Sequence, residues 1–419
     1  MRSETNWPMR AEPYGCAVAS CPQAPVTHAA VALSHTDTKE LTERFYYPEL
    51  DSIRFFLFCA VWAYHVLPMQ ESLYSVRHVP TALASLIVST IKAGMCSLDV
   101  FFILSAFLIT ELLLRERELK GTADLKAFYI RRLLRIWPLY FFVIALAGLL
   151  SLFDRSQVLG WAYALSFLLF GGNWIMVLRG FPQASTIGPL WSVSFEEQFY
   201  LFWPLVLRRA ASKRTICGIA IGLVMVGTLT RLMLLLEHQR GDPIWYNTFA
   251  RLDSIACGIL LAVILHGRAT FRIGLPARLA LLLMGGSAWM VVGLYCGLHD
   301  DVPTLVGGLL GYPLMSLGGV AIVLSVLGAA QDGAPFMKHS GLVYLGKISY
   351  GLYAYHILSW RLSLHLFSRY HLPHEWSLSW LCALALTFLL AAASFKWLES
   401  PFLRLKRRKF TYVPSGAAS

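Results

Sequence analysis

Charged residues are scarce in this sequence. Asp, Glu, Lys and Arg make up only 14% of its 419 residues, against about 25% in an average soluble domain. Apolar residues make up 57%, whereas about 45–50% is typical of soluble domains. A chain of this length with so few charges and so much apolar surface is not an ordinary soluble enzyme.

Paired cysteines are also missing. None of the eight cysteines forms a CxxC pair, and most lie within apolar runs, where cysteine behaves as a small buried hydrophobe. This pattern excludes a zinc site and a disulfide framework, and no metal is predicted. Residues 1–45 lack the compact apolar stretch of a signal peptide. We expect them to form a disordered cytoplasmic extension.

Long apolar runs dominate the rest of the chain. A run of about 20 apolar residues is long enough to cross a bilayer as one helix. The runs cover residues 52–70, 92–114, 136–153, 158–178, 190–207, 215–236, 249–266, 278–297, 305–328, 343–367 and 376–398. These eleven runs predict an all-α polytopic membrane protein.

The positive charge sets the expected orientation of these runs. The net charge is +12, and basic residues cluster at 115–135, 208–214, 268–278 and 404–409. The positive-inside rule places such loops in the cytoplasm, so a membrane explains them without a nucleic-acid partner. All four clusters fall on one side of the membrane only when ten of the eleven runs cross it.

The run at 158–178 is the one that we expect not to cross. Gly171-Gly172-Asn173 interrupts it, and such a break suits a re-entrant or interfacial segment that is buried in protein. We therefore predict about ten transmembrane helices with both termini cytoplasmic. The membrane domain covers residues 46–405, a short basic tail covers 406–419, and no internal repeat is visible.

Arg54 and His65 are ionisable residues in the first apolar run. Eleven residues are about three helical turns, so both side chains lie on one face and about 16 Å apart along the axis. The structural interpretation is an arginine that reaches the membrane surface and a core histidine whose hydrogen bonds are all made within the protein. Ionisable groups within a membrane are costly and usually functional. Histidine is also the side chain best suited to proton transfer near neutral pH.

Asp99 and three arginines are further candidates. Asp99 lies at a depth comparable to that of His65, where it could orient that histidine or form a structural ion pair. Arg131 and Arg135 share a helix face, and Arg132 adds a third guanidinium group. These arginines are either an ordinary cytoplasmic cluster or a phosphate clamp, since arginine binds phosphate with two hydrogen bonds.

The run at 190–207 carries two adjacent carboxylates, Glu196 and Glu197, which packing does not explain. They could bind sugar hydroxyls, hold a cation or shuttle a proton. Arg251 and Asp253 precede small residues and are interpreted as packing residues. Candidates for substrate binding are Trp191, Ser194, Tyr200 and His356.

In chain order, these motifs resemble those of the acyltransferase-3 family of membrane O-acyltransferases, over about residues 46–405. The ordered set is specific, although each motif is short. The matching motifs are Arg54-x10-His65, Asp99-Val100-Phe101-Phe102 with Leu104-Ser105-Ala106-Phe107, Arg131 to Tyr140, Trp191 to Tyr200, Arg251-x-Asp253, Ser349-Tyr350 with His356, and Trp397-Leu398-Glu399-x-Pro401-Phe402.

The resemblance implies transfer of an acyl group from cytoplasmic acyl-CoA to a hydroxyl of a sugar, lipopolysaccharide, peptidoglycan, exopolysaccharide or macrolide. It implies that His65 is the catalytic base and that Glu196 and Glu197 are the family's acidic pair. Arg54 and the group from Arg131 to Arg135 are implied to bind the acyl donor.

Two departures from the family pattern are mild. Ala106 stands where the family has Gly in Ser-Gly-Phe, and Phe195 stands where it has Val before the acidic pair. Neither change removes a chemical group. We also expect the chain to lack the SGNH esterase-like domain that some members carry after the membrane part.

The expected function is therefore O-acylation of a carbohydrate or glycolipid in the bacterial inner membrane, with acetyl-CoA as the donor. A proton-coupled transporter or exporter is the main alternative, because intramembrane His, Asp and Glu also build proton relays. Acyl-CoA-dependent labelling of a glycan favours the enzyme, and proton-coupled flux without acylation favours the transporter. A non-catalytic glycan-binding scaffold would not explain the buried histidine and glutamates.

Overall fold

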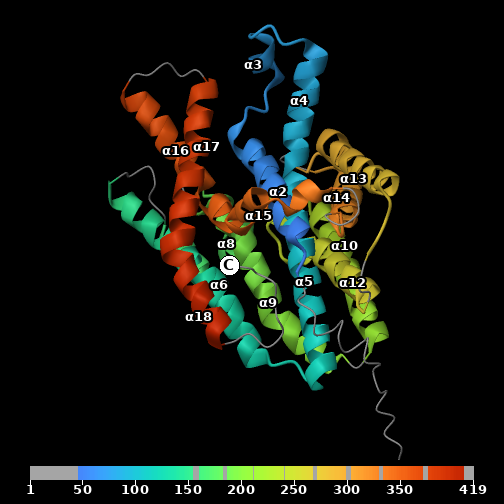
Figure 1. The fold of residues 1–419 in the computed structure, drawn as a ribbon. Helices are drawn as coiled ribbons and strands as arrows, with labels where there is room; N and C mark the ends of the chain where they lie inside the picture. The colour runs from blue at the N-terminus through green and yellow to red at the C-terminus, as the bar shows by residue number, and fades with distance from the viewer. Residues whose placement is uncertain are drawn as a thin grey trace, which may run out of the picture.

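The computed structural model describes residues 46–153, 160–182, 186–210, 212–239, 241–267, 271–298, 303–329, 334–370 and 376–409. Within these ranges the chain is almost entirely helical and has no β-strand (Figure 1). The predicted all-α fold class is confirmed. The extension at 1–45 and the tail residues 410–419 lie outside the described residues.

The first elements are α2 (Pro48–Val66), α3 (Glu71–Ser75), α4 (Thr81–Ala93), η1 (Gly94–Cys96) and α5 (Ser97–Lys120). α2 starts with Pro48. Proline has no backbone N–H, but an N–H in the first turn of a helix has no partner within the helix, so no helical hydrogen bond is lost. The tight turn η1 joins α4 and α5 into one apolar rod, Thr81–Lys120. Gly94 lets this rod approach α2, because a Cβ there would lie 2.6 Å from the carbonyl oxygen of Ala60. The sequence predicted an apolar run that starts at residue 92, whereas the structure extends the helical rod back to Thr81 through α4.

The middle of the chain forms α6 (Leu125–Phe153), α7 (Trp161–Leu168), α8 (Gly172–Arg179), η3 (Gly188–Leu190), α9 (Trp191–Arg209) and α10 (Lys213–Leu236). The interrupted run is divided into α7 and α8, as the glycine pair predicted. Between them Phe170 has a left-handed φ of 55°. Gly172 is also required, since a Cβ there would lie 2.4 Å from the ring of Phe167. The re-entrant or interfacial location of this segment stays a prediction.

The remaining elements are α11 (Gly241–Trp245), η4 (Phe249–Arg251), α12 (Leu252–Leu265), α13 (Leu275–Tyr295), α14 (Leu305–Val326), η5 (Pro335–Lys338), α15 (Ser340–Lys347), α16 (Ser349–Arg369), α17 (Trp376–Ser394), η6 (Phe395–Glu399) and α18 (Ser400–Lys409). α16 and α17 pack side by side, and α18 continues from α17 through the π-helical turn η6 (Figure 1). The short helix α15 crosses α2.

In the part of the chain that the structure describes, six apolar helices have the length and composition to cross a membrane: Thr81–Lys120, Leu125–Leu152, Lys213–Leu236, Leu275–Tyr295, Leu305–Val326 and Leu378–Lys406. Large apolar side chains are exposed on them, for example Leu283, Leu310 and Leu389, as expected for helices that face lipid. The loops that join α5 to α6 and α9 to α10 lie at the end of the molecule toward which α18 runs (Figure 1). The chain is therefore a membrane protein. The count of ten and the cytoplasmic termini stay predictions.

Two buried ion pairs join α5, α10 and the start of α12. Arg231 pairs with Asp253, and Arg251 donates to Asp99 at 2.7 Å. All four side chains are buried. The guanidinium of Arg251 also lies 4.0 Å from the ring centre of Trp245. These contacts agree with the interpretation of Arg251 and Asp253 as packing residues, and they make each charge dependent on its partner.

Candidate active site

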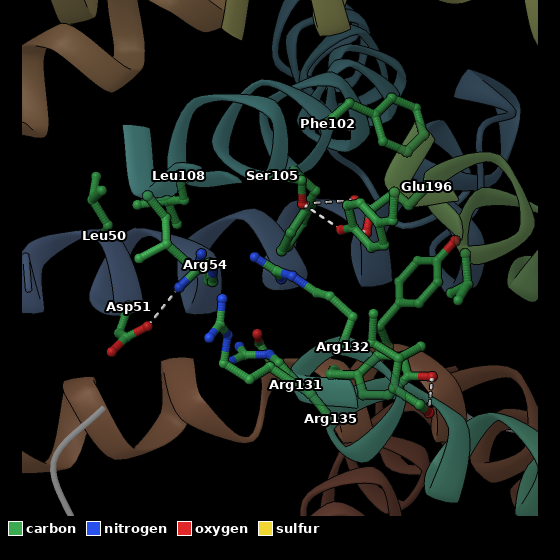
Figure 2. Close-up of a pocket in the computed structure, with 18 of the residues that line it drawn as sticks. Leu50, Asp51, Arg54, Phe102, Ser105, Leu108, Arg131, Arg132, Arg135 and Glu196 are labelled. Carbon is green, nitrogen blue, oxygen red and sulfur yellow. Dashed lines mark hydrogen bonds and ion pairs between the residues drawn. The ribbon is translucent and has the colours of Figure 1, made fainter. Parts of the chain in front are cut away.

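A cavity of about 270 Å³ lies among α2, α5, α6, α9, α16 and α18. We name it the arginine cavity, because it is lined by Arg54, Arg131, Arg132 and Arg135, with Lys406 from α18. The acidic residues of its lining are Asp51 and Glu196. Figure 2 shows the guanidinium groups of α2 and α6 turned toward one space. The excess of positive charge suits a ligand that carries phosphate groups.

Two of these arginines are fixed by carboxylates. Arg54 donates to Asp51 at 2.6 Å, one helical turn before it on α2. Arg131 donates at 3.3 Å to Glu116, a buried carboxylate near the end of α5. These bonds orient the guanidinium groups before any ligand arrives, and so reduce the ordering that binding requires.

Arg132 and Arg135 are held differently. The guanidinium of Arg132 lies 5.1 Å from the ring centre of Tyr200, and Arg135 is exposed toward the cavity. Neither forms an ion pair with a carboxylate within the described residues. The Tyr200 ring is fixed in turn, because its hydroxyl lies 2.5 Å from Glu196 and 3.0 Å from Ser105. The hydroxyl of Ser105 also donates to Glu196 at 3.1 Å.

A second cavity, of about 370 Å³, lies beside the C-terminal end of α2. We name it the aromatic cavity, because much of its wall consists of Tyr64, Phe181, Trp191, Trp245, Tyr246 and Tyr353. Its ionisable lining residues are His65 and Asp242. Aromatic walls with a few convergent polar groups are typical of sites for small organic ligands.

Leu98 and Tyr353 line both cavities and therefore form the partition between them. The hydroxyl of Tyr353 donates to the carbonyl oxygen of Pro189 at 2.7 Å and lies 2.8 Å from the hydroxyl of Ser192. These bonds tie α16 to the start of α9 and keep the ring in place between the two cavities.

His65 is backed by a second histidine. Nδ1 of His65 lies 3.0 Å from the carbonyl oxygen of Val61 and 3.2 Å from Nε2 of His356. Nδ1 of His356 bonds to the carbonyl oxygen of Tyr353. A carbonyl only accepts, so neutral His356 carries its proton on Nδ1 and presents a bare Nε2. His65 then donates from Nδ1, which leaves its Nε2 with a free lone pair.

Asp99 is held by an arginine and a serine. Its carboxylate accepts hydrogen bonds from Arg251 and Ser254, and its described hydrogen bonds do not include His65. The side chain that contacts His65 is His356, which the sequence suggested for substrate binding; the orienting role that the sequence suggested for Asp99 stays a prediction. Asp99 forms the structural ion pair that was the alternative interpretation.

Three other predicted residues, Glu197, Ser194 and His356, also lie outside both cavity linings. Glu197 accepts from the indole of Trp137 at 3.2 Å, and Ser194 is fully buried 3.2 Å from the hydroxyl of Tyr140. In the structure these contacts join α9 to α6, and the roles that the sequence suggested for Glu197 and Ser194 stay predictions. Within the described residues, no group of three or more His, Cys, Asp or Glu is placed to hold a metal ion.

Several cavity residues were not predicted from the sequence. Asp242 stands in Gly-Asp-Pro, a sequence typical of a turn, and Trp245 resembles the aromatic residues that are common near membrane surfaces. Neither residue therefore gave a functional signal in the sequence. Tyr353 had a visible signal, since it precedes His356 by three residues and shares its helix face. Arg231, a lone charge in an apolar run, was a comparable signal for the buried ion pairs.

Comparison with known proteins agrees with the motifs. The sequence profile of the family described as "Acyltransferase domain" matches residues 47–396. The chain is 25% identical over 373 residues to the peptidoglycan O-acetyltransferase OatA of Listeria monocytogenes, covering 85% of this chain and 56% of that protein. It is 26% identical over 368 residues to the O-acetyltransferase OatA of Staphylococcus aureus, covering 82% of this chain and 60% of that protein. The chain thus spans little more than half the length of these relatives. No solved structure matches it.

Proposed function

The chain belongs to the acyltransferase-3 family of membrane O-acyltransferases, and we propose that it moves an acetyl group from cytoplasmic acetyl-CoA to a hydroxyl of a cell-surface or exported carbohydrate. The proposed location is the bacterial inner membrane, with several membrane passes. One observation carries this proposal: a basic cavity and an aromatic cavity share Leu98 and Tyr353 as a common wall. Two chemically different sites that meet suit two different substrates.

The arginine cavity is the proposed donor site. Coenzyme A carries a diphosphate and a 3′-phosphate, and arginine recognises phosphate through paired hydrogen bonds. Arg54 and His65 lie eleven residues apart on α2, about 16 Å along the helix axis. The thin pantetheine arm would cover this distance, with the nucleotide against α6 and the thioester near the partition.

The aromatic cavity is the proposed acceptor site. Its aromatic faces can stack on a sugar ring, and the carboxylate of Asp242 can accept hydrogen bonds from sugar hydroxyls. The Listeria relative is named for peptidoglycan, which makes peptidoglycan the first acceptor to test. Other surface glycans and glycolipids remain within the proposed class.

The proposed chemistry uses the free lone pair of His65. Its Nε2 accepts the proton of the acceptor hydroxyl while that oxygen attacks the thioester carbonyl carbon. A carbon–oxygen bond forms, the carbon–sulfur bond breaks, and the thiolate of coenzyme A takes up the proton that His65 accepted. His356 keeps His65 in the tautomer that this step requires, since its Nε2 accepts the Nδ1 proton.

The test is transfer of label from [14C]acetyl-CoA to glycan in membrane vesicles that contain the full chain. His65→Ala should abolish transfer while leaving folded protein in the membrane. His365→Ala is the matched control, because His365 is exposed farther along α16. Near-normal transfer by His65→Ala would overturn the mechanism. Proton-coupled flux without any labelled glycan would favour the transporter alternative.

A further inference from the structure

The C-terminal helix α18 forms part of the wall of the arginine cavity. Lys406 lies on it and lines the cavity, although the family profile ends at residue 396. We infer that Lys406 binds a phosphate of coenzyme A, so that α18 is a component of the donor site rather than a cytoplasmic tail. This inference rests on the proposed donor.

The path of the chain explains why this lysine reaches the cavity. α18 packs against α6, the helix that supplies three of the cavity arginines. It follows the π-helical turn η6 (Phe395–Glu399), in which a wider turn replaces the α-helical one. One extra residue in a helix rotates everything after it by about 100°. That rotation sets which face of α18 meets α6.

The basic residues of α18 are not equivalent. Arg404, Arg408 and Lys409 are exposed and do not line the arginine cavity, whereas Lys406 is half-buried and does. If α18 only followed the positive-inside rule, its basic residues would need to lie near the membrane surface but on no particular face of the helix. The inward position of Lys406 distinguishes it from its neighbours and points to a ligand in the cavity.

The lining of the arginine cavity carries an excess of positive charge. Four arginines and Lys406 line it, against the two carboxylates of Asp51 and Glu196. Coenzyme A brings about four negative charges when its diphosphate and 3′-phosphate are both ionised. Arg132, Arg135 and Lys406 then supply positive charge from two sides of the cavity, α6 and α18. A lysine on a flexible stem suits this role, because it acts as a mobile point charge beside the rigid guanidinium groups.

Isothermal titration of the full chain in nanodiscs with coenzyme A and with pantetheine tests this inference. Lys406→Gln should raise the Kd for coenzyme A about tenfold, the lower end of the range for a hydrogen bond to a charged group. It should leave the Kd for pantetheine, which has no phosphate, unchanged. Lys406→Arg should keep most of the affinity for coenzyme A. Lys409→Gln, the same change three residues later on the exposed face, should bind like the wild type.

Three results would overturn the inference. Lys406→Gln could bind coenzyme A as tightly as the wild type, or it could lose affinity for coenzyme A and pantetheine equally. Lys406→Arg could weaken binding as much as Lys406→Gln, which would point to a packing role for the lysine. If the wild type itself bound no coenzyme A, the proposed donor would fail together with this inference, whereas in the first three cases the donor would stand.

Discussion

Gly346 lies where α15 crosses α2, and replacing it with alanine should disturb both the fold and the arginine cavity. A Cβ at this position would lie 1.8 Å from the carbonyl oxygen of Asp51. Ordinary contact begins at 3.4 Å, so the two helices would have to separate by more than an ångström. The obstacle is backbone, which has no alternative rotamer. Asp51 is also the residue that orients Arg54.

The size of the effect follows from these distances. Overpacking of this kind costs about 1–3 kcal/mol of stability. Displacing a positioned group by about 1 Å can lower a reaction rate on the order of a hundredfold. We therefore expect Gly346→Ala to lower the melting temperature in detergent and to reduce kcat/KM for acetyl-CoA about a hundredfold.

Gly286→Ala is the control for this prediction. Gly286 lies in α13, and a Cβ there would have no neighbour within 4 Å. Alanine in a helix interior is favoured over glycine by about 0.5–1 kcal/mol, so this variant should be at least as stable as the wild type and fully active. If Gly346→Ala matched Gly286→Ala in both stability and activity, the crossing of α15 over α2 would be wrong.

The other predictions concern buried charges and the histidine pair. Asp253→Asn should cost about 3–5 kcal/mol in unfolding assays, because it leaves Arg231 buried without its carboxylate; Arg231→Met with Asp253→Leu should recover most of that loss. His356→Ala should lower kcat about a hundredfold without changing the KM of the acceptor, because in the proposed mechanism it removes the group that orients the proposed base His65; a change in KM alone would favour the substrate-binding interpretation. His266 bonds to Glu111 and Glu118 at 2.8 Å each, so His266→Gln should lower the melting temperature in detergent; an unchanged melting temperature would show that these bonds do not support the fold.

Local features of the fold could be predicted because they depend on neighbouring residues in the sequence. The break between α7 and α8 falls at Gly171-Gly172, where the lack of a side chain on Gly172 is a local property that the close Phe167 ring requires. The helical spacing of Arg54 and His65 also follows from local geometry. In the structure the two side chains line different cavities.

The partners of buried charges could not be predicted in the same way. Asp99 and Arg251 are 152 residues apart, and only the packing of η4 and α12 against α5 brings them together. The depth of Asp99 suggested a contact with His65, but depth alone does not specify the direction of a side chain around its helix. The inward position of Lys406 was hidden for a related reason, because the π-helical turn before it changes the face on which the lysine lies.

The partition formed by Leu98 and Tyr353 also bears on the energy supply of the cell. A single open passage between the two sides would leak protons and dissipate the membrane potential, which is worth about 2.3 kcal/mol per charge at 100 mV. If each proposed substrate enters from its own side of the membrane, the shared wall separates the two cavities and helps the bilayer to stay electrically sealed. The aromatic ring of Tyr353, tied by its hydroxyl to the start of α9, is then an insulator as well as a wall.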